Sequence, residues 1–323
     1  MPTAFCQLPT YFRMLYLVIS IFLSVLLFLL FKSFDSFKVN TFLAIVVNYV
    51  ICVFIGLIFL QFSHLPGRYS MYNVLYHPLY IFHHTWVILA FIIGVLFVFT
   101  FYLMALTAQM VSVTLSVVAN KMSLVIPVLF SLFVFKIESR DFTFFNILGI
   151  ITALSAIYLC TFRPGGKLNR ELIYFLPLSV FILGGVIDTM INYTNYKYIG
   201  ESEESLFPLI MFISASLAGI VVVLYMIITQ QLKIDLKSIA AGIVLGIPNY
   251  FSIYFLLKAL TAFNNNGALV FPIFNIGIIM VAAILAFIIF KEELLNVNKI
   301  GLALAVLAIF LIYYQELRLI IDY

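Results

Sequence analysis

Apolar residues along this chain fall into ten runs, and short polar or charged connectors separate each run from the next. A helix that crosses a bilayer needs about 20 mostly apolar residues, which is close to the length of these runs. The runs cover residues 14–31, 40–61, 85–106, 109–135, 144–162, 173–197, 206–228, 238–260, 264–290 and 300–316. Because the hydrocarbon core offers no partners to open backbone groups, the pattern predicts an all-α integral membrane protein with ten transmembrane helices.

The composition also indicates that the chain lies in a lipid bilayer. Hydrophobic residues make up 65% of the 323 positions and charged residues only 9%, which is more apolar surface than an ordinary soluble domain can bury. The net charge of +4 is spread over the connectors without a basic cluster, so no nucleic-acid partner is expected. The three cysteines (Cys6, Cys52 and Cys160) share no metal or redox spacing, and no cofactor is expected.

Two short motifs recur at nearly the same distance along the chain. Ala-Leu-Thr-Ala at 105–108 returns at 259–262, an offset of 154 (259 − 105). Phe-Lys-x-Glu at 135–138 returns at 290–293, an offset of 155 (290 − 135). These matches predict a duplicated five-helix unit.

The predicted repeats divide the chain as residues 14–162 and 173–316, with 1–13 as an N-terminal extension and 317–323 as a C-terminal tail. An odd number of helices makes the second unit enter the membrane upside down. The fold class is therefore predicted as two inverted five-helix repeats, an arrangement typical of alternating-access transporters.

On these features the chain resembles the EamA-like branch of the drug/metabolite transporter superfamily over nearly its whole length. The resemblance rests on the five-plus-five pattern, on Pro127 in the fourth helix, and on Phe-Lys-x-Glu followed by a helix bearing Gly149 or Gly301. It implies a transporter architecture with cytoplasmic termini. That orientation leaves six Lys and Arg residues of the loops inside and nine outside, against the positive-inside rule.

The predicted fourth helix carries two polar residues at its centre, Asn120 and Lys121. Lys121 lies 12 residues after Gln109 and 15 before Lys136, so at about 1.5 Å per residue it is about 18–22 Å from either end. An ionised lysine there costs about 2.5–3.5 kcal/mol on insertion scales. An anionic partner, a wet cavity or loss of the proton would offset that cost.

Asp188 is the candidate partner, because it is an acid well inside the sixth helix. Asp188, Asn192 and Asn195 follow at i, i+4 and i+7 as one polar stripe, after Gly184 and Gly185. A structural ion pair between Lys121 and Asp188 is the competing interpretation.

Further polar residues are expected at similar depth. Asn48 is central in the second helix, Asn249 and Tyr250 follow Pro248 in the eighth, and Asn275 lies 155 residues after Asn120 (275 − 120). The predicted substrate-binding residues are Lys121, Asp188, Asn120, Asn192, Asn249, Tyr250, Asn275 and Asn48. For each asparagine, an interhelical hydrogen bond is an equally good explanation. A metal site at His64, His77, His83 and His84 is disfavoured by their irregular spacing.

The sequence thus predicts a secondary transporter, in the exporting direction, of a small polar or zwitterionic metabolite such as an amino acid. Its partners would be that small molecule, the bilayer of the plasma (inner) membrane and a proton as candidate coupling ion, with the chain a monomer or homodimer. The acids are scattered rather than clustered at one surface, so an enzyme is not expected. A lipid-headgroup flippase and a non-transporting membrane scaffold remain as alternatives.

Overall fold

The computed structural model describes residues 10–62, 84–133, 143–162, 170–199, 206–263 and 267–314. Every regular element in these ranges is an α-helix. The helices are α1 (Thr10–Ser36), α2 (Thr41–Phe62), α5 (Thr85–Met110), α6 (Val113–Met122), α7 (Val125–Phe133), α8 (Phe144–Thr161), α9 (Arg170–Tyr198), α10 (Leu206–Ile228), α11 (Leu236–Ala262), α12 (Gly267–Phe290) and α13 (Asn296–Ile312).

Within this described part, nine segments are long and apolar enough to cross a membrane, α6 and the start of α7 counting as one of them. Helix α13, with 17 residues, is a shorter apolar helix. The prediction of an all-helical, multi-pass membrane protein is therefore confirmed over the described residues.

Two predicted boundaries are wrong. The fourth helix was expected to run unbroken over 109–135. Instead α5 continues to Met110, α6 covers only Val113–Met122, and α7 starts again at Val125. Helix α1 begins at Thr10, four residues before the predicted start at 14.

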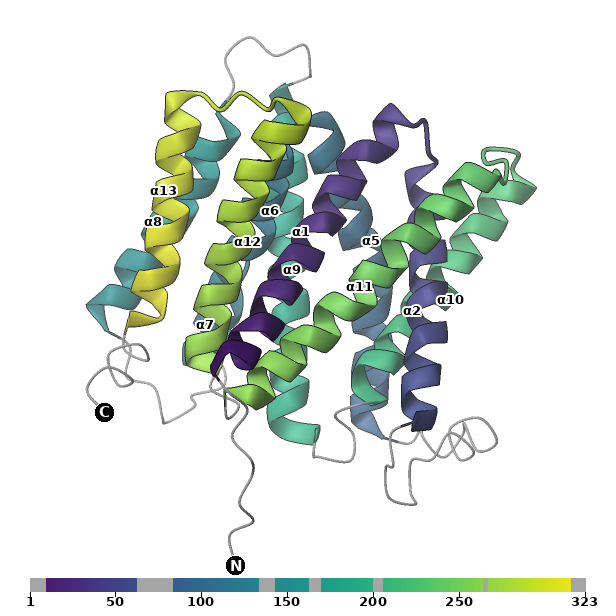
Figure 1. The fold of residues 1–323 in the computed structure, drawn as a ribbon, viewed down its shortest axis with the longest axis horizontal. Helices are drawn as coiled ribbons and strands as arrows, with labels where there is room; N and C mark the ends of the chain where they lie inside the picture. Colours follow the sequence, from purple (N-terminus) through teal and green to yellow (C-terminus); the bar gives the residue numbers. More distant parts are fainter. Residues whose placement is uncertain are drawn as a thin grey trace, which may run out of the picture.

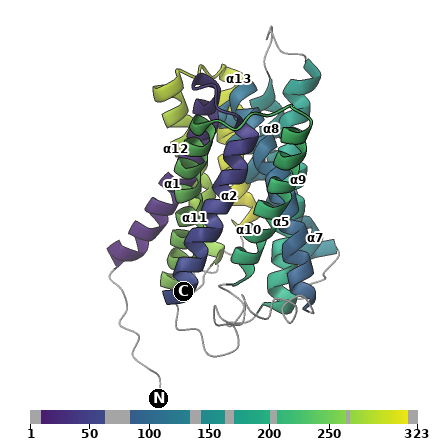
Figure 2. The same cartoon turned by 90° about the vertical axis from the view of Figure 1, so that its right-hand side faces the viewer.

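The helices form one bundle, in which α1 and α11 run obliquely to the more upright α2, α8 and α13 (Figure 1). Helices α8 and α13 pack together at one edge, and α2 packs on α10 and α11 toward the other. Turned by 90°, the bundle has α1 and α12 on one side and α5 and α9 on the other (Figure 2). Helix α1 starts and α13 ends on the same face of the bundle.

Helices α8 and α13 hold each other through reciprocal contacts. Asn146, in the first turn of α8, donates its amide to the carbonyl of Ile312 at the end of α13 (3.0 Å). Asn298, in the first turn of α13, donates in return to the end of α8, at the carbonyls of Leu159, Cys160 and Phe162 (2.9–3.1 Å). A buried amide between two antiparallel helices satisfies end carbonyls that would otherwise lack partners.

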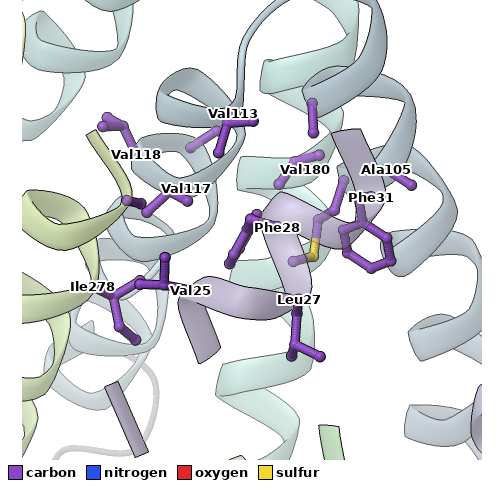
Figure 3. Close-up of a cluster of buried hydrophobic side chains, with 14 of the residues drawn as sticks. Val25, Leu27, Phe28, Phe31, Ala105, Val113, Val117, Val118, Val180 and Ile278 are labelled. Atoms are coloured by element: carbon purple, nitrogen blue, oxygen red, sulfur yellow. The ribbon is translucent and has the colours of Figure 1, made fainter. Parts of the chain in front are cut away.

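An apolar core fills the centre of the bundle between α1, α6, α9 and α12 (Figure 3). Val25 and Phe28 of α1 meet Val117 of α6, Val180 of α9 and Ile278 of α12, all of them buried. These side chains form an apolar contact shared by the four helices.

Candidate functional site

The break between α6 and α7 lies where the sequence places Asn120 and Lys121. Pro127 has no N–H to donate to the carbonyl four residues earlier, that of Ser123, so one regular helical hydrogen bond is missing at this point. The Ser123 carbonyl accepts from the N–H of Ile126 instead (2.9 Å). The Ser123 hydroxyl donates to the carbonyl of Asn120 (2.5 Å) and so serves the open end of α6. Irregular backbone at membrane depth is tolerated only where protein or water satisfies it, as happens here.

Helix α9 brings a carboxyl group to this break. Oδ2 of Asp188 lies 3.0 Å from the Ser123 hydroxyl oxygen. The approach is possible because Gly184 has no side chain: a Cβ there would lie 3.1 Å from the same oxygen. A small residue on α9 thus sets the distance between the acid and the broken helix.

Lys121 occupies the last turn of α6 and is half-buried. Its ammonium nitrogen lies 5.1 Å from the ring centroid of Phe274 on α12, a cation–π contact. A lysine in the last turn also faces the negative end of the helix dipole. Lys121 and Asp188, both among the described residues, form no ion pair within 4.0 Å.

Helix α9 has two exposed faces of different character. One is apolar and includes Phe175, Ile182 and Val186. The other begins at Asp188 and continues through Asn192 and Asn195, all exposed. At about 100° per residue, Asp188 lies about 120° around the helix from Ile182, so the two faces point in different directions. One carboxylate oxygen of Asp188 contacts the Ser123 hydroxyl, and the exposed side chain does not lie on the apolar face.

The asparagines of α2 and α11 form a separate buried group. Asn249 donates its amide to Oδ1 of Asn48 (3.1 Å) and lies 3.5 Å from the sulfur of Cys52. The amide nitrogen of Asn48 is buried and has no hydrogen-bond partner. Tyr250, half-buried beside them, packs its ring on Phe212.

The eight predicted residues therefore fall into two groups in the described structure. Lys121, Asn120 and Asp188 gather at the break, with Asn192 one turn further along α9. Asn48, Asn249 and Tyr250 lie between α2 and α11, and no hydrogen bond joins the two groups. Asn275 is half-buried on α12, directly after Phe274. That Lys121, Asp188, Asn192, Asn249 and Asn275 line one cavity near mid-depth stays a prediction.

Two residues of the site were missed from sequence, Ser123 and Phe274. Ser123 carried a usable signal, because a serine four residues before a proline marks a carbonyl that loses its helical donor and a hydroxyl that can serve the open end. Phe274 carried none, since one aromatic residue among 35 phenylalanines cannot be singled out.

Other predicted features fall partly outside the described residues. These are His64, His77 and His83, the first Phe-Lys-x-Glu motif and Cys6. His84, which is described, stacks on Trp86 just before α5. The described residues contain no group of three or more His, Cys, Asp or Glu able to hold a metal ion. Cys52 and Cys160 are both buried and free.

Comparison with known proteins gives one relative and no family. An uncharacterized protein of Haemophilus influenzae is 29% identical over 227 residues, covering 69% of this chain and 74% of that protein. No family model matches the chain.

Proposed function

We propose that this protein is a secondary transporter that moves a small polar or zwitterionic metabolite by alternating access. The observation that carries the proposal is a lysine and an aspartate placed together at a broken helix in the middle of the membrane. Intramembrane ionisable residues are costly and commonly mark substrate or ion pathways, and transporter sites are commonly built at discontinuous helices. The EamA-like resemblance belongs to the same proposal and rests on the sequence features alone.

The packing of the helices supports two inverted repeats. If α1 and α9 are repeat mates, each should contact the third and fourth helices of the opposite half. Helix α1 packs on α11 and α12, and α9 packs on α5, α6 and α7, as that pairing requires. The reciprocal asparagine contacts of α8 and α13 fit the same twofold relation, with an offset of 152 (298 − 146).

One departure from this symmetry supports a conformation open to one face. Helix α1 also packs on α5 and α6 of its own half. Among the described residues, α9 has no comparable contact with α11 or α12, the equivalent helices of the second half. A transporter closed on one face and open on the other differs between its repeats in this way. The polar face of α9 from Asp188 to Asn195 then borders the open side.

The chemistry at the break suits a zwitterion. The Lys121 ammonium would face a substrate carboxylate, and the Asp188 carboxylate would face an amine. A phosphate-bearing substrate suits the site less well, because phosphates usually recruit several Lys or Arg residues.

The test is uptake of a radiolabelled amino-acid mixture into liposomes that contain the purified protein. Lys121→Met should reduce uptake about tenfold or more, since a charge-assisted contact is worth about 1.5–3 kcal/mol. Lys258→Met is the matched control, because Lys258 also lies near an aromatic ring (Tyr254, 5.7 Å) but is exposed near the end of α11. Full uptake by Lys121→Met would overturn the assignment of this lysine to the substrate.

The double variant Lys121→Met/Asp188→Asn separates substrate binding from a structural role. If Lys121 only neutralises Asp188, removing both charges restores stability and uptake together. If Lys121 binds substrate, uptake stays lost in the double variant while thermal stability is retained.

A further inference from the structure

A carboxylate from the second half of the chain holds the start of α6. Helix α12 ends at Phe290, and Lys291 adopts a left-handed backbone conformation (φ 53°) that turns the chain back toward the bundle. Glu292 follows, and its carboxylate reaches the N-terminus of α6, about 180 residues away in sequence.

The Glu292 carboxylate accepts hydrogen bonds from four donors. Oε1 accepts from the backbone N–H of Val113 (2.8 Å), and Oε2 accepts from the backbone N–H of Thr114 (3.4 Å). The hydroxyls of Ser112 and Thr114 also lie within reach of Oε2, at 3.2 and 3.1 Å. The first N–H groups of a helix have no partner inside it, and the positive end of the helix dipole favours an anion there.

These contacts do more than cap a helix. Helix α6 already has its own capping residue, because the Ser112 hydroxyl accepts from the N–H of Leu115 (3.1 Å). What Glu292 adds is a bond between the connection that follows α12 and the segment that carries Lys121. It ties the two halves of the chain together at one face of the bundle.

The same face is closed beneath this contact. The buried side chains of Val25, Phe28, Val117 and Ile278 pack together (Figure 3), and Val117 lies on α6 between its first turn, which contacts Glu292, and the break at its end. Beside it, the end of α1 is fastened to the end of α5, since Gln109 donates to the carbonyl of Phe31 (2.9 Å). On this face, hydrogen bonds between helix ends lie outside a packed apolar core, and together they close this side of the molecule.

Helix α6 connects the closed face to the candidate substrate site. Its 10 residues span about 15 Å, with Glu292 at one end and Lys121 in the last turn at the other. Because the chain is broken after Met122, α6 can tilt without carrying α7 with it.

From this arrangement we infer that Glu292 is the latch of the gate on this face, and that α6 opens the gate when its first turn leaves the Glu292 carboxylate. The inference rests on the proposed transport function, of which it names the gate. Glu292 is a positioning residue in this scheme: it never touches the substrate and acts through α6.

Cysteine accessibility tests the latch without any transported substrate. Val117→Cys places a thiol on the buried face of α6, between Glu292 and the break. In reconstituted protein it should react slowly with a membrane-impermeant maleimide added from the α6 N-terminal face. Adding Glu292→Gln should raise that labelling rate about tenfold or more. The glutamine amide has one oxygen that can accept, but its NH₂ group would face the donors of Ser112, Val113 and Thr114, which need an acceptor.

Glu293→Gln is the matched control, since Glu293 is adjacent and exposed. It should leave the labelling rate unchanged, and protein without Val117→Cys measures background labelling of the native thiols. A second variant, Ser112→Ala/Thr114→Val, removes two donors while keeping Glu292 and should give a smaller increase.

Equal labelling rates in Glu292→Gln and Glu293→Gln would overturn the latch, provided that thermal unfolding shows both proteins to be folded. If Glu292→Gln does not fold, the Ser112→Ala/Thr114→Val variant becomes the test. An unchanged labelling rate in that variant would overturn the latch. Failure of the transport proposal looks different: wild-type protein would take up no labelled amino acid, whatever the labelling rates.

Discussion

Gly185 decides how closely α9 can approach the α6–α7 break. A Cβ at this position would overlap the side chain of Ile126 and lie 2.6 Å from its Cβ, far inside van der Waals contact. Since Gly184 next to it faces Ser123, the two glycines together seat α9 on the break and bring Asp188 to it.

We therefore expect Gly185→Ala to lower the stability of the bundle by about 1–3 kcal/mol, the usual cost of overpacking. Thermal unfolding in detergent would measure the loss. Ile126→Ala in the same chain removes the overlapping Cδ1 and Cγ1 but keeps Cβ, so the double variant should recover part of that stability. A double variant no more stable than Gly185→Ala would show that the glycine serves some purpose other than close packing.

At the scale of single residues, the sequence is informative where a side chain is out of place in its surroundings. Lys121 and Asp188 could be singled out because a charge is rare in an apolar run, and the structure brings both to the same break. Glu292 could not, because a glutamate at the polar end of a helix is ordinary there. Its role depends on a contact across about 180 residues that no local pattern encodes.

Among the helices, α11 has the best-defined start. The Asp235 carboxylate accepts from the backbone N–H of Ser238 (2.8 Å) and from its hydroxyl (2.7 Å), and that hydroxyl accepts from the N–H of Asn40 (2.7 Å). The hydrogen bonds from the Ser238 hydroxyl and N–H hold the pKa of the Asp235 carboxyl below its usual value. The start of α2 is thus fastened to the start of α11 through an ionised carboxylate.

This arrangement predicts a pH-dependent contribution to stability. Because the pKa is lowered in the folded protein, Asp235 stabilises the fold above the ordinary aspartate pKa of about 3.9, and the effect is lost as pH falls through the folded pKa. Asp235→Ala should be less stable than wild type at neutral pH, with the difference vanishing in acid. Asp235→Asn keeps a capping oxygen without a titrating group, so its deficit should vary less with pH.

Melting temperatures in detergent, measured from neutral to acidic pH, would check this. A gap between wild type and Asp235→Ala that stays constant over the whole pH range would contradict it.

At the scale of helices, the hydrophobic runs predicted the positions of the membrane spans well, but they did not predict where a helix is broken. Run length reflects bilayer thickness, which is the same for every span, so most helices lie where the apolar runs predict them. The α6–α7 break was missed because both sides of it are equally apolar. Pro127 removes one helical hydrogen bond beside the break, an effect that does not register in hydropathy.

For the whole molecule, the pairing of helices was predictable only as a hypothesis. Short motif matches suggested a duplicated unit, and the reciprocal neighbours of α1 and α9 agree with that hypothesis. The two halves differ in that α1 touches its own α5 and α6, whereas among the described residues α9 has no comparable contact with α11 or α12, and under the proposed function that difference belongs to one conformation. A sequence specifies every conformation that a chain can adopt, so it does not reveal which one is populated.

The asparagine-bound pair α8 and α13 also has a consequence for the surrounding lipid. These helices have 18 and 17 residues, about 26–27 Å in length, whereas a typical hydrocarbon core is about 30 Å thick. Phe144, Ile151 and Tyr158 of α8 are exposed along this edge. Acyl chains beside the pair must therefore compress to meet it, while those beside the 29-residue α9 need not. We expect the melting temperature of the reconstituted protein to be higher in short-chain than in long-chain phosphatidylcholine, and equal values in both would show that the edge imposes no local thinning.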